Sequence, residues 1–136
     1  MSVDVSEYRL LYIKTASELI QRYADILHSV RKTGLALDTS TIDELHRIFH
    51  SLKGQSLALG YQKLGNLFFQ LEQLFSYGKE KEHIIPYTIT SQLPPSDRLL
   101  TFVRQPEDTT LHVEVDVQLA EVATIERSLG IIQRSL

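Results

Sequence analysis

Three residues with the types and spacing needed for chemistry are His50, Lys53 and Gly54. Residues three and four apart lie on one face of a helix, so Lys53 and Gly54 are expected one turn beyond His50 on the same side. An imidazole supplies a nitrogen nucleophile near neutral pH, and a neighbouring ammonium can stabilise the negative charge of a transferring phosphoryl group. Glycine removes a side chain where the active site of another protein would have to approach.

The segment that carries these residues has the apolar spacing of an amphipathic helix over about residues 42–59. Its inward residues are expected to be Leu45, Phe49, Leu52, Ser56 and Leu59. Because this stripe faces the core, His50 is turned towards solvent. Thr41 and Glu44 predict a capping box at the start of the helix, and Gly60 predicts its end. Ser56 and its neighbour Gln55 are expected either to line the acceptor site or to fill a helix interface.

Three further helices are predicted over about residues 5–30, 61–77 and 117–135, from apolar residues that recur at intervals of three and four. The apolar set of the first helix begins with Tyr8, Leu11 and Tyr12. The very short connection at residues 60–61 predicts an antiparallel hairpin between the second and third helices.

The segment 79–116 holds all four prolines and is expected to be irregular. Within it, residues 96–104 could form a short helix with Ser96 as its cap. Residues 111–115 alternate in polarity like a strand, which could pair with residues 87–90 in a hairpin. The predicted fold is therefore all-α: a single domain over residues 1–136, built as an antiparallel four-helix bundle with an irregular excursion before the last helix.

The composition excludes several classes of function. The chain has 136 residues, no cysteine and a formal net charge of -3, so disulfides, thiol chemistry and a polybasic nucleic-acid surface are not expected. It has no apolar run of the ~20 residues that would span a bilayer, and its N-terminus does not resemble a secretory signal. We expect a cytoplasmic monomer that binds neither nucleic acid nor membrane.

The pattern His-x-Leu-Lys-Gly-x-Ser-x-x-Leu-Gly at residues 50–60, followed by an amphipathic helix ending in Leu-Glu, resembles the signature of histidine-containing phosphotransfer (HPt) domains. The resemblance is strong over residues 42–75. Residues 11–18 are more weakly similar to the opening helix of the N-terminal domain of chemotaxis-type histidine kinases. This resemblance implies a four-helix bundle in which His50 accepts the phosphoryl group, with Lys53 and Gly54 as its neighbours.

The resemblance also assigns a role to Glu72, because chemotaxis-type domains carry a glutamate 22 residues after the acceptor histidine that bonds its imidazole. A carboxylate that accepts from Nδ1–H leaves the lone pair of Nε2 free to attack. Phe69 stands where some members have a second histidine that touches this network. His46, one turn before His50, could form a metal-binding pair with it, but no third ligand is evident and no metal is expected.

The expected function is that of a phosphoryl carrier without a kinase site of its own, because the chain lacks a glycine-rich phosphate loop and a receiver-type magnesium site. The expected partners are the catalytic domain of a histidine kinase and a response-regulator receiver domain. No cofactor is expected on this chain, and the partner would supply Mg²⁺. It could be free-standing or the N-terminal domain of a larger chemotaxis-type kinase. The alternative is a helical adaptor that binds signalling partners without being phosphorylated.

Overall fold

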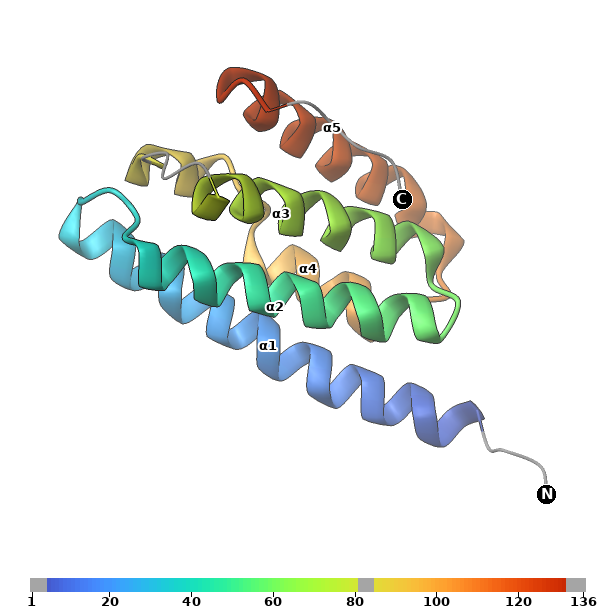
Figure 1. Cartoon of the computed structure of the whole chain (residues 1–136). Helices are drawn as coiled ribbons and strands as arrows, with labels where there is room; N and C mark the ends of the chain where they lie inside the picture. Colours follow the sequence, from blue (N-terminus) through green and yellow to red (C-terminus); the bar gives the residue numbers. More distant parts are fainter. Residues whose placement is uncertain (1–4, 81–84, 132–136) are drawn as a thin grey trace.

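The computed structural model describes residues 5–80 and 85–131, and the regular elements of these residues are helical. The elements are α1 (Val5–Thr33), α2 (Thr39–Ala58), α3 (Gln62–Glu80), the 3₁₀ helix η1 (Tyr87–Ser91), α4 (Ser96–Arg104), the 3₁₀ helix η2 (Thr109–Leu111) and α5 (His112–Ser128). Figure 1 shows them packed as a helical bundle. The prediction of an all-α helical bundle is confirmed.

The helices α2 and α3 form the predicted hairpin and run side by side (Figure 1). Gly60 lies in their short connection with φ at +80°, a left-handed conformation that glycine adopts without steric cost. Both helices turn continuous apolar stripes inward. The buried side chains are Ile42, Leu45, Ile48, Phe49 and Leu52 from α2, and Leu64, Leu67, Phe68, Leu71, Leu74 and Phe75 from α3. The hairpin therefore sets which residues of α2 and α3 face each other.

The helix α2 begins earlier than predicted, and its cap is a different residue. Asp38 accepts a hydrogen bond from the backbone N–H of Thr41 at 2.7 Å, so α2 starts at Thr39. The capping box expected from Thr41 and Glu44 is wrong. An aspartate three residues upstream satisfies the same backbone donor, and Glu44 forms an ion pair with Arg22 of α1 instead.

The helix α1 packs against α2 and α4 through Tyr12, Ala16, Ile20, Tyr23 and Leu27. Tyr8 and Leu11 belong to the apolar set from which this helix was predicted, but they are 51% and 56% exposed. They border a shallow apolar groove with Ala58 and Leu59 at the end of α2. Here the first turns of α1 continue the apolar spacing, but among the described residues the buried side chains of this helix begin at Tyr12.

Ser56 and Gln55 were expected either to line the acceptor site or to fill a helix interface, and their hydrogen bonds distinguish the two. Ser56 Oγ lies 2.9 Å from the hydroxyl of Tyr12, and Gln55 accepts a hydrogen bond from Thr15 at 2.7 Å. Both partners belong to α1. Ser56 and Gln55 therefore join α1 to α2, and we find neither of them bonded to His50.

The candidate hairpin in segment 79–116 is wrong. Residues 87–90 lie in η1, and residues 111–115 span the end of η2 and the start of α5. Five alternating residues do not distinguish the two structures, because Leu111 and Val115, four apart, also share one face of a helix. In the helix, Val115 is buried on the inner side of the turn, while Val113 lies on the outer side and is 70% exposed.

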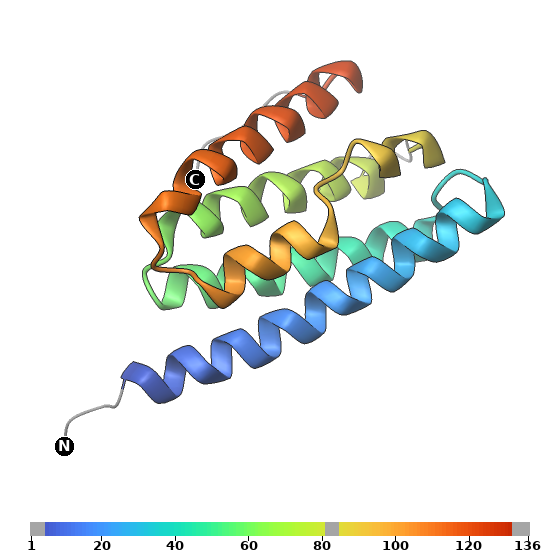
Figure 2. The same ribbon diagram turned by 180° about the vertical axis from the view of Figure 1, so that it is seen from behind.

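The short helix predicted at residues 96–104 is present as α4, although its cap position is Pro95 instead of Ser96. Its residues Leu99, Phe102 and Val103 are buried. Figure 2 shows α4 between α1 and α3. The hydroxyl of Tyr23 on α1 donates to the carbonyl of Pro94 at 2.8 Å and fixes the entry to α4.

The fourth long helix was expected over residues 117–135 as the member that completes the bundle. Instead, α4 packs along α1, while α5 lies against α3 on the side away from α2 (Figure 1). The helix α5 spans His112–Ser128 and buries Val115, Val122 and Ile125. Residues 132–136, the end of the predicted helix, lie outside the described part of the chain. Among the described residues, we find no helix long and apolar enough to cross a membrane.

Candidate functional site

His50 lies on the outer side of α2, as its position beside the apolar stripe predicts. Its side chain is 65% exposed, and its Nδ1 lies 2.7 Å from Oε1 of Glu72 on α3. The contact spans the hairpin and joins residues 22 positions apart. A carboxylate cannot donate when ionised, so the imidazole must carry its proton on Nδ1 in this contact. Nε2 is then the nitrogen with a free lone pair.

Glu72 is a buried acidic residue at the edge of the apolar stripe of α3. Burial alone would raise the pKa of its carboxyl group, but hydrogen bonds from Lys53 and His50, together with their positive charges, outweigh burial and lower the pKa below its usual value. The carboxylate therefore remains ionised at neutral pH. An ionised acceptor makes a stronger hydrogen bond to the imidazole than a neutral one would.

Lys53 completes the contacts of this carboxylate. Its Nζ lies 2.7 Å from Oε2 of Glu72 and 5.5 Å from the centroid of the Phe69 ring. The side chain is 20% exposed, so the ammonium is held near the protein surface. An ammonium has three hydrogens to donate, and pairing with Glu72 leaves it able to donate to an incoming anion as well. Phe69 thus packs beneath the cation of the network.

Gly54 is exposed, and a Cβ atom built on it would meet no other atom within 4 Å. Gly65 of α3 is the opposite case, because a Cβ there would lie 2.3 Å from the side chain of Leu57. Close helix packing therefore explains Gly65 but not Gly54. Gly54 follows His50 by one turn on the exposed side of α2, and the exposed Ala58 follows by another. This row of small side chains leaves the surface beside the imidazole flat.

His46 also belongs to this site. From the sequence, it was considered only as half of a metal-binding pair with His50, and no metal was expected there. Its ring stacks with that of His50 at a centroid distance of 6.3 Å and an interplanar angle of 18°. Its Nε2 lies 3.9 Å from the same Glu72 Oε1 that binds His50. The four-residue spacing indicates that His46 lies beside His50 on one face of the helix. Its distance to Glu72 could not be predicted in this way, because Glu72 lies on the other helix of the hairpin. Among residues 5–80 and 85–131, we find no group of three or more metal-binding side chains.

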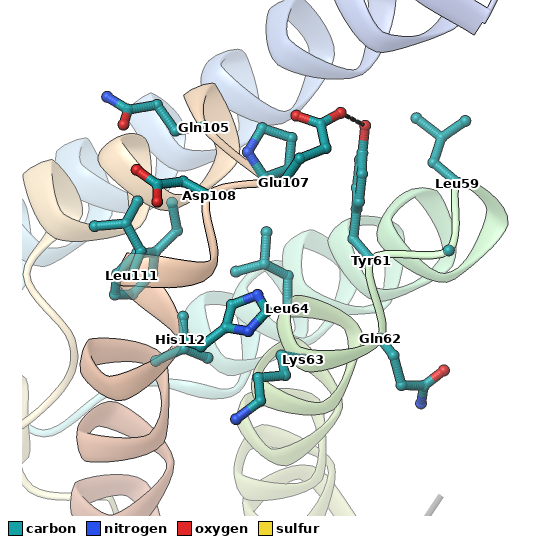
Figure 3. A pocket seen from close by; sticks show the side chains of 14 residues that line it. Leu59, Tyr61, Gln62, Lys63, Leu64, Gln105, Glu107, Asp108, Leu111 and His112 are labelled. Atoms are coloured by element: carbon teal, nitrogen blue, oxygen red, sulfur yellow. Dashed lines mark hydrogen bonds between the residues drawn. The ribbon is translucent and has the colours of Figure 1, made fainter.

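A cavity of about 370 Å³ lies elsewhere, between the α2–α3 connection and the segment that leads into α5. Figure 3 shows its lining, with Tyr61 bonded to Glu107 at the rim and Leu64, Leu111 and His112 around it. None of the predicted site residues lines this cavity. The candidate site is instead an open surface, a form suited to exchange with the active site of another protein.

Comparison with protein families finds a match over residues 7–105 to the family model described as Hpt domain. The match begins in α1 and ends just beyond α4, so it contains the whole hairpin and the His50 site. The helix α5 lies outside it. A comparison with curated proteins finds no match.

Proposed function

The chain belongs to the Hpt domain family, and we propose that it carries a phosphoryl group on Nε2 of His50 and passes it to an aspartate of a receiver domain. Hpt domains are phosphocarriers of two-component signalling that exchange phosphoryl groups with kinases and receiver domains and lack kinase activity of their own. The observation that carries the assignment to His50 is the 2.7 Å contact between its Nδ1 and Glu72. It leaves the outward-facing imidazole with one available nucleophilic nitrogen.

In the proposed reaction, the lone pair of Nε2 attacks the phosphorus of the donor. The N–P bond forms as the bond between phosphorus and the donor atom breaks, and the electron pair of that bond stays on the donor. The proton remains on Nδ1, where Glu72 stabilises the positive charge that develops on the ring. The onward step reverses this order, because the carboxylate oxygen of the receiver aspartate attacks phosphorus and the N–P electron pair returns to Nε2.

Lys53 and Gly54 support this exchange in different ways. Lys53 holds Oε2 of Glu72, which orients the carboxylate towards His50, and its remaining donors face the negative charge of the phosphoryl group. Gly54 leaves room beside the imidazole for the partner. The Mg²⁺ that phosphoryl transfer requires would be bound by the partner. The proposed donor is the catalytic domain of a histidine kinase, either separate or on the same polypeptide. A cytoplasmic location and a monomeric state stay predictions from the sequence.

The proposal is tested by incubating the protein with a radiolabelled phosphorylated receiver or histidine kinase. Label should appear on the wild type and be acid-labile and base-stable, as expected for phosphohistidine. His50→Gln should remove the label while leaving the helical circular dichroism intact, because the side chain is exposed. His28→Gln, which changes an exposed histidine on α1, is the matched control and should label normally. Label that persists in His50→Gln would contradict the proposal, and a wild type that binds its partner without labelling would be an adaptor.

A further inference from the structure

Three cationic or donor groups converge on the single carboxylate of Glu72. Oε2 pairs with Lys53, while Oε1 lies 2.7 Å from His50 Nδ1 and 3.9 Å from His46 Nε2. A separation of 3.9 Å is too long for a hydrogen bond but short enough for a strong interaction between charges. His46 therefore has little effect on Oε1 through hydrogen bonding in this arrangement and a large effect once its ring is protonated.

We infer that His46 is a positioning residue whose protonation controls how firmly Glu72 holds the imidazole of His50; this inference rests on the proposed function of His50. When His46 is neutral, Oε1 is left to Nδ1–H of His50. When His46 is protonated, its ring attracts Oε1 and weakens that contact. The reactive tautomer of His50 is then less well defined.

The stacking of the two rings acts in the same direction. Positive charge develops on the His50 ring as Nε2 bonds to phosphorus, and a protonated His46 ring at 6.3 Å opposes it. The titratable groups near His46 include His50 and Lys53 on α2 and Glu72 on α3. Asp43, three residues before His46 on α2, is a further charged neighbour and forms an ion pair with Arg47. A proton on His46 should therefore slow the attack by the neutral imidazole of His50.

The side-chain exposures support separate roles for the two rings. His46 is 24% exposed and His50 is 65% exposed, so His50 is the ring open to a partner's phosphoryl group. His46 is partly covered and close to the carboxylate. Its effect on the reaction is therefore expected to pass through Glu72 and through charge on the neighbouring ring.

The test uses phosphoramidate, a small donor that requires no partner protein. Nε2 of His50 attacks its phosphorus, the P–N bond of the reagent breaks, and ammonia leaves with the bonding electron pair. Initial rates are measured by ³¹P NMR from pH ~5 to ~8, the range in which imidazoles titrate. The proteins compared are the wild type, His46→Gln, His46→Phe and His28→Gln, each first shown to be folded by circular dichroism. His46→Phe keeps a stacked ring without a titratable nitrogen.

Each rate is divided by the fraction of His50 that is neutral at that pH, which nitrogen-15 NMR of the imidazole reports, because a protonated His46 also disfavours protonation of His50. The wild type should lose this corrected rate more steeply towards low pH than the two His46 variants. Charges about 4–6 Å apart change a neighbouring equilibrium by about tenfold or more, so the ratio of corrected rates, His46→Gln to wild type, should rise from near unity at pH ~8 to roughly tenfold at pH ~5. His46→Phe should follow His46→Gln, and His28→Gln should follow the wild type. Parallel profiles for all four proteins would overturn the inference alone. A wild type that never acquires phosphate on His50 would overturn the proposed function and, with it, this inference.

Discussion

The carboxylate of Glu72 lies 2.7 Å from Nδ1 of His50, across the hairpin formed by α2 and α3. The same carboxylate is held from its other oxygen by Lys53 at 2.7 Å. Because both contacts are made by a buried acidic group whose pKa is lowered, the carboxylate is charged and oriented before any partner arrives. The reactive form of the imidazole is thus set by the resting protein.

Substitution Glu72→Gln tests this relationship. The amide keeps the size of the carboxylate but lacks its charge, so the Nδ1–H tautomer of His50 should be less populated. Hydrogen bonds to charged groups exceed neutral ones by about 1 to 1.5 kcal/mol, which predicts phosphorylation slower by roughly tenfold. Nitrogen-15 NMR of the imidazole reports the tautomer, and a transfer assay reports the rate. Unchanged ring nitrogen shifts in Glu72→Gln would show that the contact does not operate in solution.

The lowered pKa of Glu72 also predicts how its contribution to stability depends on pH. A carboxyl group whose pKa is depressed in the folded state binds protons more readily when unfolded, so it stabilises the fold at higher pH, and this contribution is lost as pH falls through the folded pKa. That window lies below the usual value of 4.5. The unfolding free energy of the wild type should therefore fall more steeply below pH 4.5 than that of Glu72→Gln.

Urea denaturation at several pH values measures this difference. Other carboxyls whose pKa is lowered, such as Asp38, Glu107 and Asp108, are the same in both proteins and cancel in the comparison. If the unfolding free energy of both proteins falls with the same slope below pH 4.5, then Lys53 and His50 do not lower the pKa of Glu72 in the folded state.

Two glycines provide a matched pair of substitutions. Gly54→Ala places a Cβ in open space and should stabilise α2 by about 1 kcal/mol, whereas Gly65→Ala places its Cβ 2.3 Å from Leu57 and should lower the thermal midpoint. Gly54→Leu should likewise leave the fold intact, yet slow transfer from a protein partner sharply. Because phosphoramidate is small, it should still label Gly54→Leu at close to the wild-type rate. Equal slowing with both donors would show that Gly54 affects the imidazole itself and not partner access.

The elements around the site could be predicted because the information for them is local. The apolar stripes of α2 and α3 and the short connection at Gly60 define a hairpin, and a hairpin with a short turn determines which residues lie opposite His50. The exposure of His50 follows from the burial of Phe49 and Leu52 beside it. The contact with Glu72 was expected from the family resemblance, and the structure contains it.

The remainder depends on packing between distant segments. Residues 111–115 carry a pattern that suits either a strand or one helical turn, and helix formation at this point accompanies burial of Val115. The last helix was expected to complete the bundle, but α4 packs against α1 in its place. This could not be predicted, because both helices have an apolar face and their sequences do not show which of them packs against α1. The distance from His46 to Glu72 is likewise a property of the assembled hairpin.

The helix α5 offers a last prediction, because it lies outside the family match and on the side of α3 away from α2 (Figure 1). Ile125 is 1% exposed, so Ile125→Ala removes a buried side chain and should cost about 2 to 5 kcal/mol of unfolding free energy. Val113→Ala on the same helix changes a residue that is 70% exposed and should cost less than about 0.5 kcal/mol. Because α5 lies on the side of α3 away from α2, which carries His50, both variants should accept phosphate at the wild-type rate at a temperature where they remain folded. Denaturation and phosphoramidate labelling of the two proteins measure these effects separately. A slower reaction in folded Ile125→Ala would show that the packing of α5 is transmitted through α3 to Glu72.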